Sequence, residues 1–213
     1  MPIDPHLFNG EGERFRRYGR FLIDPFAKTL SIFEHDKFFQ DKKFDQLYGD
    51  IHRSFAPMEK EDFENDFFQM LVVDSYKALP LQGVERTAPY EVSAHMIRIE
   101  ATALSSKGRP APEGIHRDGY YFGSIHLMRR ENVRGADSNI YDLRKNLTCT
   151  TRLNEPMDSI YFNDRAILHG VTSFECDRPL GKATRDMLIL LYQPLSESPQ
   201  RSVPAQSLRR IAL

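Results

Sequence analysis

The pattern of hydrophobic and polar positions divides the chain into two parts. In residues 37–55, hydrophobic side chains recur at helical spacing, which predicts an amphipathic helix that ends before Pro57. A second pattern of this kind predicts a helix over residues 59–76. The segment 12–24 is basic and then apolar, with a strand-like end. We therefore expect an N-terminal part, about residues 1–89, that is largely helical.

After residue 90 the pattern changes to short hydrophobic runs separated by Gly, Pro, Asn and Asp. These runs predict strands at 90–101, 120–128, 138–143, 147–153, 159–164, 166–174 and 186–195. Many short strands with turn signals between them are typical of double-sheet β-architectures. The expected fold is mainly β, a jelly roll over about 90–195 with flanking α-helices, in a single domain spanning 1–213. The Ser-, Pro- and Arg-rich tail, 196–213, is expected to be flexible.

Composition narrows the classes of function. Charged residues make up 28% of the chain and the net charge is −1, so no basic face for nucleic acid is expected. No apolar run approaches the ~20 residues that span a bilayer, and the first residues do not resemble a signal peptide. The two cysteines, Cys149 and Cys176, support neither a disulfide scaffold nor a zinc site. We therefore expect a cytoplasmic protein.

One short motif carries candidate chemistry. His116 and Asp118 are two residues apart, so in an extended segment both side chains point to the same face while Arg117 points away. His169 lies far downstream in another strand-like run. Two imidazoles and one carboxylate are the facial triad that holds a non-haem Fe(II) and leaves coordination positions open. The alternative interpretation is a surface His–Asp pair and an ordinary core histidine at 169.

An arginine strengthens the iron interpretation. An oxygenase that uses 2-oxoglutarate needs a cation for the far carboxylate of this cosubstrate, and the planar guanidinium of arginine binds a carboxylate through two hydrogen bonds. Arg185 begins the last long strand-like run, after His169. Arg178 is the competing candidate, but its surroundings, DRPLGK, resemble a loop. Either arginine is otherwise an ordinary solvated side chain.

With these residues in this order, the chain resembles the Fe(II)/2-oxoglutarate dioxygenases. It resembles most the bacterial family that includes the L-isoleucine dioxygenases, which hydroxylate free amino acids. The resembling segments are 14–21, 95–101, 110–142 and the run IYFNDRAILHGVTSF with the following RDMLIL; PEGIHRDG is the most specific part. Two departures are Ala136, where a second glycine is expected, and Asn163, where the family often has an acidic residue.

The resemblance implies cofactors and roles. Fe(II), 2-oxoglutarate and dioxygen are the expected cofactor and cosubstrates. His116, Asp118 and His169 are the implied catalytic iron ligands, and Arg185 is the implied 2-oxoglutarate-binding residue. The expected reaction hydroxylates an unactivated carbon while 2-oxoglutarate is converted to succinate and carbon dioxide.

The substrate is less constrained than the metal site. A zwitterionic amino acid needs one cation and one or more acceptors, and the candidate pocket residues are Arg98, His95, Tyr120 and Tyr141. Alternatively, Arg98 pairs with Glu100 or another carboxylate on a sheet face, and the tyrosines are packing residues. The loop 102–114, just before the metal motif, is a candidate lid.

Several functions remain open on the sequence alone. The leading one is hydroxylation of a small molecule, a free aliphatic L-amino acid such as isoleucine or leucine. The same chemistry on a natural-product or carrier-bound intermediate is an alternative, as is a non-enzymatic jelly-roll binding module. A zinc hydrolase with His/Asp/His ligands is a fourth. Neither nucleic acid nor membrane is an expected partner, and the oligomeric state is open, with a homodimer among the alternatives.

Overall fold

The computed structural model describes residues 1–6, 13–44, 47, 49–102, 107–178, 181–198 and 208–211. Its strands are β1 (Glu13–Asp24), β2 (Thr29–Phe33), β3 (Ala56–Pro57), β4 (Tyr90–Thr102), β5 (Phe122–Glu131), β6 (Val133–Gly135), β7 (Ser138–Tyr141), β8 (Leu147–Thr151), β9 (Ser159–Asn163), β10 (Leu168–Val171), β11 (Phe174–Cys176), β12 (Lys182–Pro194) and β13 (Leu208–Ile211). Its helices are α1 (Lys60–Phe63), α2 (Asp66–Lys77) and the short 3₁₀ turns η1 (Gly83–Arg86) and η2 (Leu195–Glu197).

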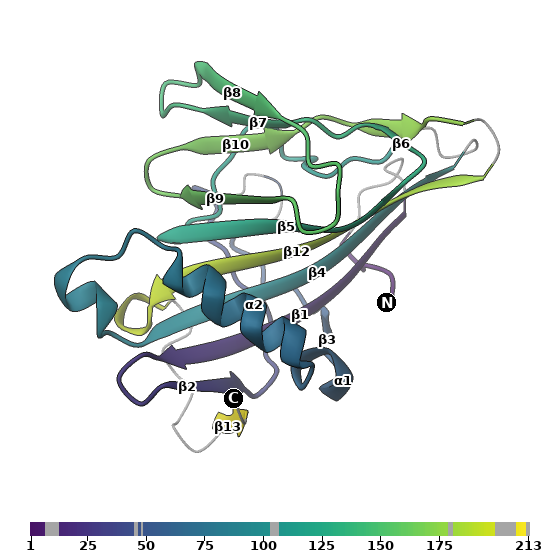
Figure 1. Cartoon of the computed structure of the whole chain (residues 1–213). Coiled ribbons are helices and arrows are strands. Elements are labelled where there is room, and N and C mark those ends of the chain that lie inside the picture. Colours follow the sequence, from purple (N-terminus) through teal and green to yellow (C-terminus); the bar gives the residue numbers. More distant parts are fainter. Residues whose placement is uncertain are drawn as a thin grey trace.

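A large antiparallel sheet forms the body of the fold. Its strand order is β13-β2-β1-β4-β12-β5-β9, and the short β3 pairs in parallel with β1. A three-stranded sheet, β10-β7-β8, and the pair β11-β6 form the smaller second layer. In Figure 1, α2 crosses one side of the large sheet, and β10, β7 and β8 lie beyond β9. This mainly β arrangement confirms the predicted jelly roll with flanking helices.

Strict alternation along β12 separates the two faces of the large sheet. Leu188, Leu190 and Tyr192 join the hydrophobic cluster beneath α2. The residues between them, with Arg185 and Met187 before them, line a pocket on the opposite face. Successive side chains of a strand point in opposite directions. Because β12 has apolar residues on both faces, both faces must be covered.

The helix α2 covers the face away from the pocket. The Asn65 side chain caps its first turn by accepting a hydrogen bond from the Phe68 backbone N–H at 3.2 Å. Its buried residues include Leu71, Val72 and Tyr76, which pack on the sheet. Burial of each large apolar side chain contributes roughly 1.5–3 kcal/mol, so this contact fixes the helix more firmly than its sequence propensity does.

The structure corrects the prediction that residues 1–89 are largely helical. Strands β1 and β2 occupy much of this region, and the predicted helix over 37–55 is absent from its described residues. Phe38 instead forms an isolated β-bridge with Arg53, and both Phe38 and Phe55 are buried against Tyr18. The predicted helix over 59–76 is present, but it is divided into α1 and α2 before Asn65.

The C-terminal tail is also corrected in part. Predicted as flexible, it contributes β13, which pairs antiparallel with β2. Residues 199–207 and 212–213 of this tail lie outside the described residues, as do residues 103–106 of the candidate lid. Within the described part of that loop, Gly108 pairs with Phe174 through two backbone hydrogen bonds of 2.9 Å, which ties the loop to β11.

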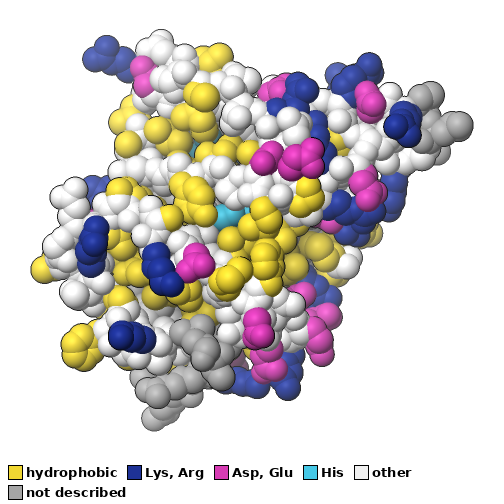
Figure 2. All heavy atoms as spheres, in the orientation of Figure 1, with side chains coloured by type: hydrophobic (Ala, Val, Ile, Leu, Met, Phe, Trp, Pro, Cys, Tyr) yellow, Lys and Arg dark blue, Asp and Glu magenta, His cyan; other side chains and the backbone are white. Residues whose placement is uncertain are grey.

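The described surface carries mixed charges. On the face shown in Figure 2, Lys and Arg side chains are interspersed with Asp and Glu. Among the described residues, no helix is long and apolar enough to cross a membrane.

Candidate metal centre and active site

A direct backbone pairing brings the two distant histidines together. The N–H of His116 donates to the carbonyl of His169 at 2.9 Å, and the N–H of His169 donates back at 2.8 Å. The segment before β5 therefore extends the small sheet along β10. Gly114 and Gly119 flank this segment with φ of 80° and 87°, as expected for a chain that turns sharply on both sides of the motif.

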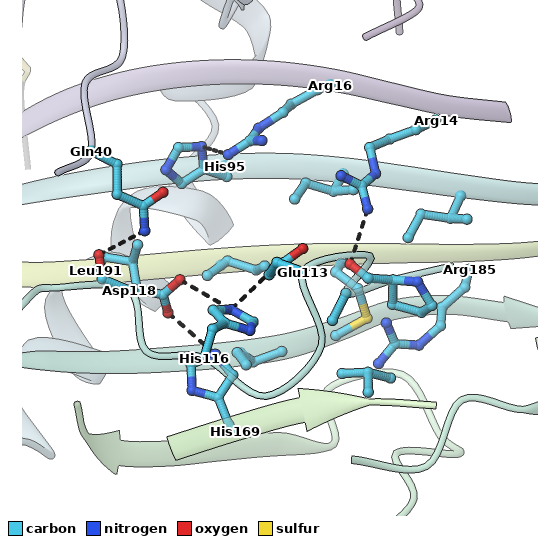
Figure 3. A pocket seen from close by; sticks show the side chains of 18 of the residues that line it. Arg14, Arg16, Gln40, His95, Glu113, His116, Asp118, His169, Arg185 and Leu191 are labelled. Carbon is cyan, nitrogen blue, oxygen red and sulfur yellow. Dashed lines mark hydrogen bonds and ion pairs between the residues drawn. The ribbon is translucent and has the colours of Figure 1, made fainter. Parts of the chain in front are cut away.

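Three side chains converge at this pairing. Potential ligand atoms of His116, Asp118 and His169 all lie within 4.8 Å of one another. The Asp118 carboxylate is 3.7 Å from Nε2 of His116 and 3.4 Å from Nε2 of His169 (Figure 3). As predicted, Arg117 points away, with its guanidinium 4.9 Å from the ring centre of Phe44. The three groups could hold one metal ion from one side and leave the other side open.

A hydrogen bond selects the tautomer of His116. Its Nδ1 lies 3.0 Å from the carbonyl of Gly114, so Nδ1–H donates there. In the neutral ring that binds a metal, Nε2 then carries the lone pair, and it faces Asp118. Metal-binding histidines are commonly oriented in this way by a second partner. The donor set and its orientation therefore fit a divalent ion such as Fe(II).

The electrostatics of the cluster favour a cation. Burial opposes the charged form of His116, but the carboxylates of Asp118 and Glu113 outweigh it and raise its pKa to about 10. Burial lowers the pKa of His169 to about 4, which keeps this imidazole neutral. Burial also opposes ionisation of Asp118, yet the neighbouring imidazoles keep the pKa of that carboxyl below its ordinary value. Without a metal, the carboxylates therefore hold a proton on His116 beside the neutral His169. A divalent cation would take the place of that proton, because metal binding releases protons from its ligands.

A buried carboxylate positions the metal loop. Asp164 is fully buried and accepts three backbone hydrogen bonds, from the N–H groups of Asp118 (2.9 Å), Gly119 (2.7 Å) and Tyr120 (3.0 Å). These bonds hold the chain as it leaves the small sheet and enters β5. Asn163, the departure noted in the sequence, only caps a surface turn by accepting from the Arg165 N–H. The acidic side chain that holds the metal loop is therefore Asp164, next to this departure.

We expect Asp164→Asn to weaken metal binding. Asparagine has one acceptor oxygen where aspartate has two, so at least one of the three N–H groups is left unpaired, at a cost of ~1–3 kcal/mol in stability. A loosened loop displaces Asp118, and the affinity for Co(II), measured by calorimetry, should fall by ~10–100-fold.

A matched control for this variant is available. Asp158 also accepts two backbone hydrogen bonds, from Asn154 and Glu155, at an exposed turn. Asp158→Asn should lower the melting temperature slightly and leave Co(II) affinity unchanged. Equal Co(II) affinity in Asp164→Asn and wild type would contradict the positioning role.

The metal cluster opens into a pocket between the two layers. Arg185 lies at one end of it (Figure 3), 3% exposed, and its Nε has no hydrogen-bond partner among the described residues. Burial lowers the pKa of Arg185 to about 10, aided by nearby Arg130, so it remains charged at neutral pH. A buried cation with an unpaired donor is costly unless an anion binds it. Arg178, the competing candidate, lies in an exposed turn away from this pocket.

Of the four predicted substrate residues, one lines the pocket and three do not. His95 lines the pocket, as expected. Arg98 is on the opposite face of the same strand, where its guanidinium forms two 2.7 Å hydrogen bonds with Asp186. The alternative interpretation of Arg98, pairing with a carboxylate on a sheet face, is therefore correct, and the partner is Asp186 rather than Glu100. Tyr120 is buried in the core, and the half-buried Tyr141 pairs with Leu168; among the described residues neither lines the pocket.

Sequence reasoning missed several polar residues of the pocket. They come from β1, from the irregular segment between β2 and β3, and from the loop before the metal motif: Arg14, Arg16, Gln40, Arg53 and Glu113. Gln40 donates to the carbonyl of Asp118 at 2.9 Å, and Arg53 donates to Gln40. The sequence did contain a signal for two of them, because Arg14 and Arg16 alternate along the strand-like run RFRRY and so point to one face of β1. The irregular segment offers no comparable pattern.

A jelly roll that holds two histidines and an aspartate in an open facial arrangement, with a buried arginine beside them, defines the class of non-haem iron oxygenases. Comparison with family models specifies this class further. Residues 1–191 match the model of the 2OG-Fe dioxygenase family, and the chain belongs to this family. Its members use Fe(II), 2-oxoglutarate and dioxygen, which agrees with the cofactors predicted from the sequence.

Solved structures show the same architecture. A bsmA homologue from Methylobium petroleophilum PM1 is 27% identical, with a TM-score of 0.80 over 91% of this chain and 77% of that chain. IDO from Bacillus thuringiensis is 22% identical, with a TM-score of 0.73 over 88% and 81% of the two chains. The Fe(II)/α-ketoglutarate-dependent dioxygenase TqaL is 17% identical, with a TM-score of 0.67 over 93% and 74%. A comparison with curated protein sequences gives no match.

Proposed function

We propose that this 2OG-Fe dioxygenase hydroxylates an unactivated carbon of a free aliphatic L-amino acid such as isoleucine or leucine. The observation that supports the proposal most is the composition of the pocket. Beside the metal cluster, aliphatic side chains such as Ile97, Ile125 and Ile189 form its walls, while charged groups of both signs project into it. A small zwitterion with an aliphatic side chain matches both features.

Within this proposal, His116, Asp118 and His169 are the iron ligands, and Arg185 binds the far carboxylate of 2-oxoglutarate. The bound iron and 2-oxoglutarate supply the oxidising chemistry, in which dioxygen gives one oxygen atom to succinate and one to the hydroxylated product, with release of carbon dioxide. The protein's own residues orient the reactants and exclude water. Met187 and Val171, which line the pocket with Arg185, contribute to that exclusion.

The proposal predicts that one or more aliphatic L-amino acids stimulate succinate formation. Anaerobically iron-loaded protein is given 2-oxoglutarate, air and each proteinogenic amino acid in turn, and mass spectrometry then locates the hydroxyl group. We expect at least ~10-fold stimulation over the uncoupled rate, because a bound substrate completes the site and excludes water. Uncoupled turnover that no amino acid stimulates would assign the substrate to another class, such as a natural-product or carrier-bound intermediate.

The same assay separates the remaining alternatives. A zinc hydrolase would not consume oxygen, because zinc does not undergo redox chemistry. A binding module would give no succinate under any condition, although membership of the family supports an oxygenase. The cytoplasmic location and the oligomeric state remain predictions from the sequence.

A further inference from the structure

Arg16 is a second arginine of the pocket, and its surroundings are unusual. It lies on β1 opposite Ile97 of β4, with its guanidinium 4.0 Å from the ring centre of Phe55. Its Nη2 is 2.8 Å from Nδ1 of His95, and its buried Nε has no hydrogen-bond partner. Among the described residues, it forms no ion pair with any carboxylate. The carboxylates of Asp4 and Glu113 act on its charge only from beyond ion-pair distance.

His95 positions this arginine. His95 is 2% exposed, and its ring stacks on Tyr18 at 4.8 Å between centroids, with Nε2 3.2 Å from the hydroxyl of Ser93. Burial, with Arg16 and Arg53 nearby, lowers the pKa of His95 well below its ordinary value, so the ring is neutral. With Nε2–H donating to Ser93, Nδ1 accepts from Arg16 and fixes the guanidinium fork toward the pocket.

The pocket also contains a carboxylate suited to the opposite charge. The Glu113 side chain is 18% exposed and has Oε1 3.2 Å from Nε2 of His116. That nitrogen is the one that faces the metal cluster, so a ligated ion would take its lone pair and leave Glu113 available for another positive group. In Figure 3, Glu113 lies between Arg16 and Arg185, so the two arginines are on different sides of it in this view.

Arg16 differs from the other arginines of the pocket in the donors that it leaves unused. Of the pocket's arginines, Arg14 is held by the carbonyls of Arg109 and Pro110, and Arg53 donates to Gln40. Arg185 is matched by the far carboxylate of 2-oxoglutarate, as proposed above. A bound iron ion would be held beside Asp118, and the near carboxylate of 2-oxoglutarate would share its charge there. Arg16 has one hydrogen bond, to neutral His95, and a buried Nε without a partner, so it is an oriented cation that can still bind an anion next to the isoleucine-lined wall.

We infer that Arg16 and Glu113 form the subsite for the two charged ends of an α-amino acid, with Arg16 binding the carboxylate and Glu113 binding the ammonium group. This inference rests on the proposed function, because it assumes that the substrate shares the pocket with iron and 2-oxoglutarate. The planar fork of Arg16 provides paired donors for the carboxylate, and the aromatic wall of Phe55 and Phe38 limits its rotation.

Truncated substrates test each half separately. The probes are L-leucine, 4-methylpentanoate, which lacks the ammonium group, and 3-methylbutylamine, which lacks the carboxylate. Their dissociation constants are measured by anaerobic calorimetry on protein loaded with Fe(II) and 2-oxoglutarate. Arg16→Gln should weaken L-leucine ~100-fold and leave 3-methylbutylamine unchanged. Glu113→Gln should weaken L-leucine ~10-fold or more and leave 4-methylpentanoate unchanged.

The controls address other roles of these residues. Arg17, the next residue of β1, forms an ion pair with Glu59 away from the pocket, and Arg17→Gln should bind all three probes as wild type does. Iron content and 2-oxoglutarate affinity should stay at wild-type values in both pocket variants. Loss of iron from Glu113→Gln would overturn its role as the ammonium site and indicate a metal ligand. Loss of 2-oxoglutarate affinity alone in Arg16→Gln would overturn the carboxylate site.

The outcomes also separate this inference from the proposed function. If an aliphatic amino acid is hydroxylated but binds Arg16→Gln as tightly as wild type, the subsite is wrong and the proposed function stands. If no amino acid binds, but 4-methylpentanoate binds wild type and not Arg16→Gln, the amino acid substrate and the Glu113 assignment are wrong. In that case Arg16 would still bind a carboxylate, but one that belongs to a substrate other than an amino acid.

Discussion

Replacing His116 or Asp118 by alanine is expected to reduce substrate-dependent succinate formation to the background of the protein-free assay. Each variant leaves two of the three groups whose ligand atoms lie within 4.8 Å of one another. Changes outside the ligand set typically cost ~10–100-fold in metal affinity, and loss of a ligand itself should cost more. Iron content after gel filtration measures the binding defect independently of turnover.

Arg117→Gln is the control for both variants. Arg117 stands between the two ligands in sequence, but its guanidinium lies against Phe44 on the outside of the loop. Iron content and succinate formation should therefore stay near wild type. Full turnover in both alanine variants would refute the site assignment. If Arg117→Gln also loses iron and succinate formation, the alanine variants act by disrupting the loop and not by removing ligands.

The metal cluster could be predicted because its geometry is local. In an extended segment the side chains of His116 and Asp118 share a face whatever the rest of the chain does. The position of His169 required a long-range pairing, which the sequence suggested only through a strand-like run and the order of the residues. Ala136, noted as a departure, has φ of 58° next to Gly135 at 102°. The backbone there adopts the conformation that favours glycine, which explains the family pattern.

The error at Arg98 follows from the same rule of alternation. His95 and Arg98 are an odd number of residues apart, so an uninterrupted strand must place them on opposite faces. β4 is uninterrupted from Tyr90 to Thr102, and only His95 reaches the pocket. The sequence therefore contained enough information to reject one of the two. Tyr120 and Tyr141 could not be rejected in this way, because both positions lie at or beyond strand ends.

The region around Phe38 could not be predicted from local patterns. Its aromatic residues have helical spacing, yet burial of Phe38 and Phe55 against Tyr18 of β1, and of Phe38 against His95 of β4, determines the conformation. Tertiary contacts of this kind override intrinsic propensity. Gln40 and Arg53 reach the pocket only because that irregular segment folds over it. Residues placed by long-range packing, rather than by strand periodicity, are those that the sequence did not reveal.

Arg185→Gln is expected to raise the KM for 2-oxoglutarate by ~100-fold with a smaller effect on kcat. Two charge-assisted hydrogen bonds to the far carboxylate would be lost, and each contributes ~1.5–3 kcal/mol, partly recovered by the glutamine amide. A ground-state contact of this kind acts mainly on binding. The loss should be specific to that carboxylate, so 2-oxopentanoate, which lacks it, tests the assignment directly.

Wild type should therefore prefer 2-oxoglutarate strongly over 2-oxopentanoate, and Arg185→Gln should bind the two about equally. Arg178→Gln is the matched control, because Arg178 competes with Arg185 in sequence but lies in an exposed turn. An unchanged preference in Arg185→Gln, with loss of preference in Arg178→Gln, would reverse the assignment. If Arg16→Gln loses this preference instead, Arg16 binds the far carboxylate of 2-oxoglutarate and Arg185 becomes the candidate for the substrate carboxylate. This exchange is possible because both arginines line the same pocket.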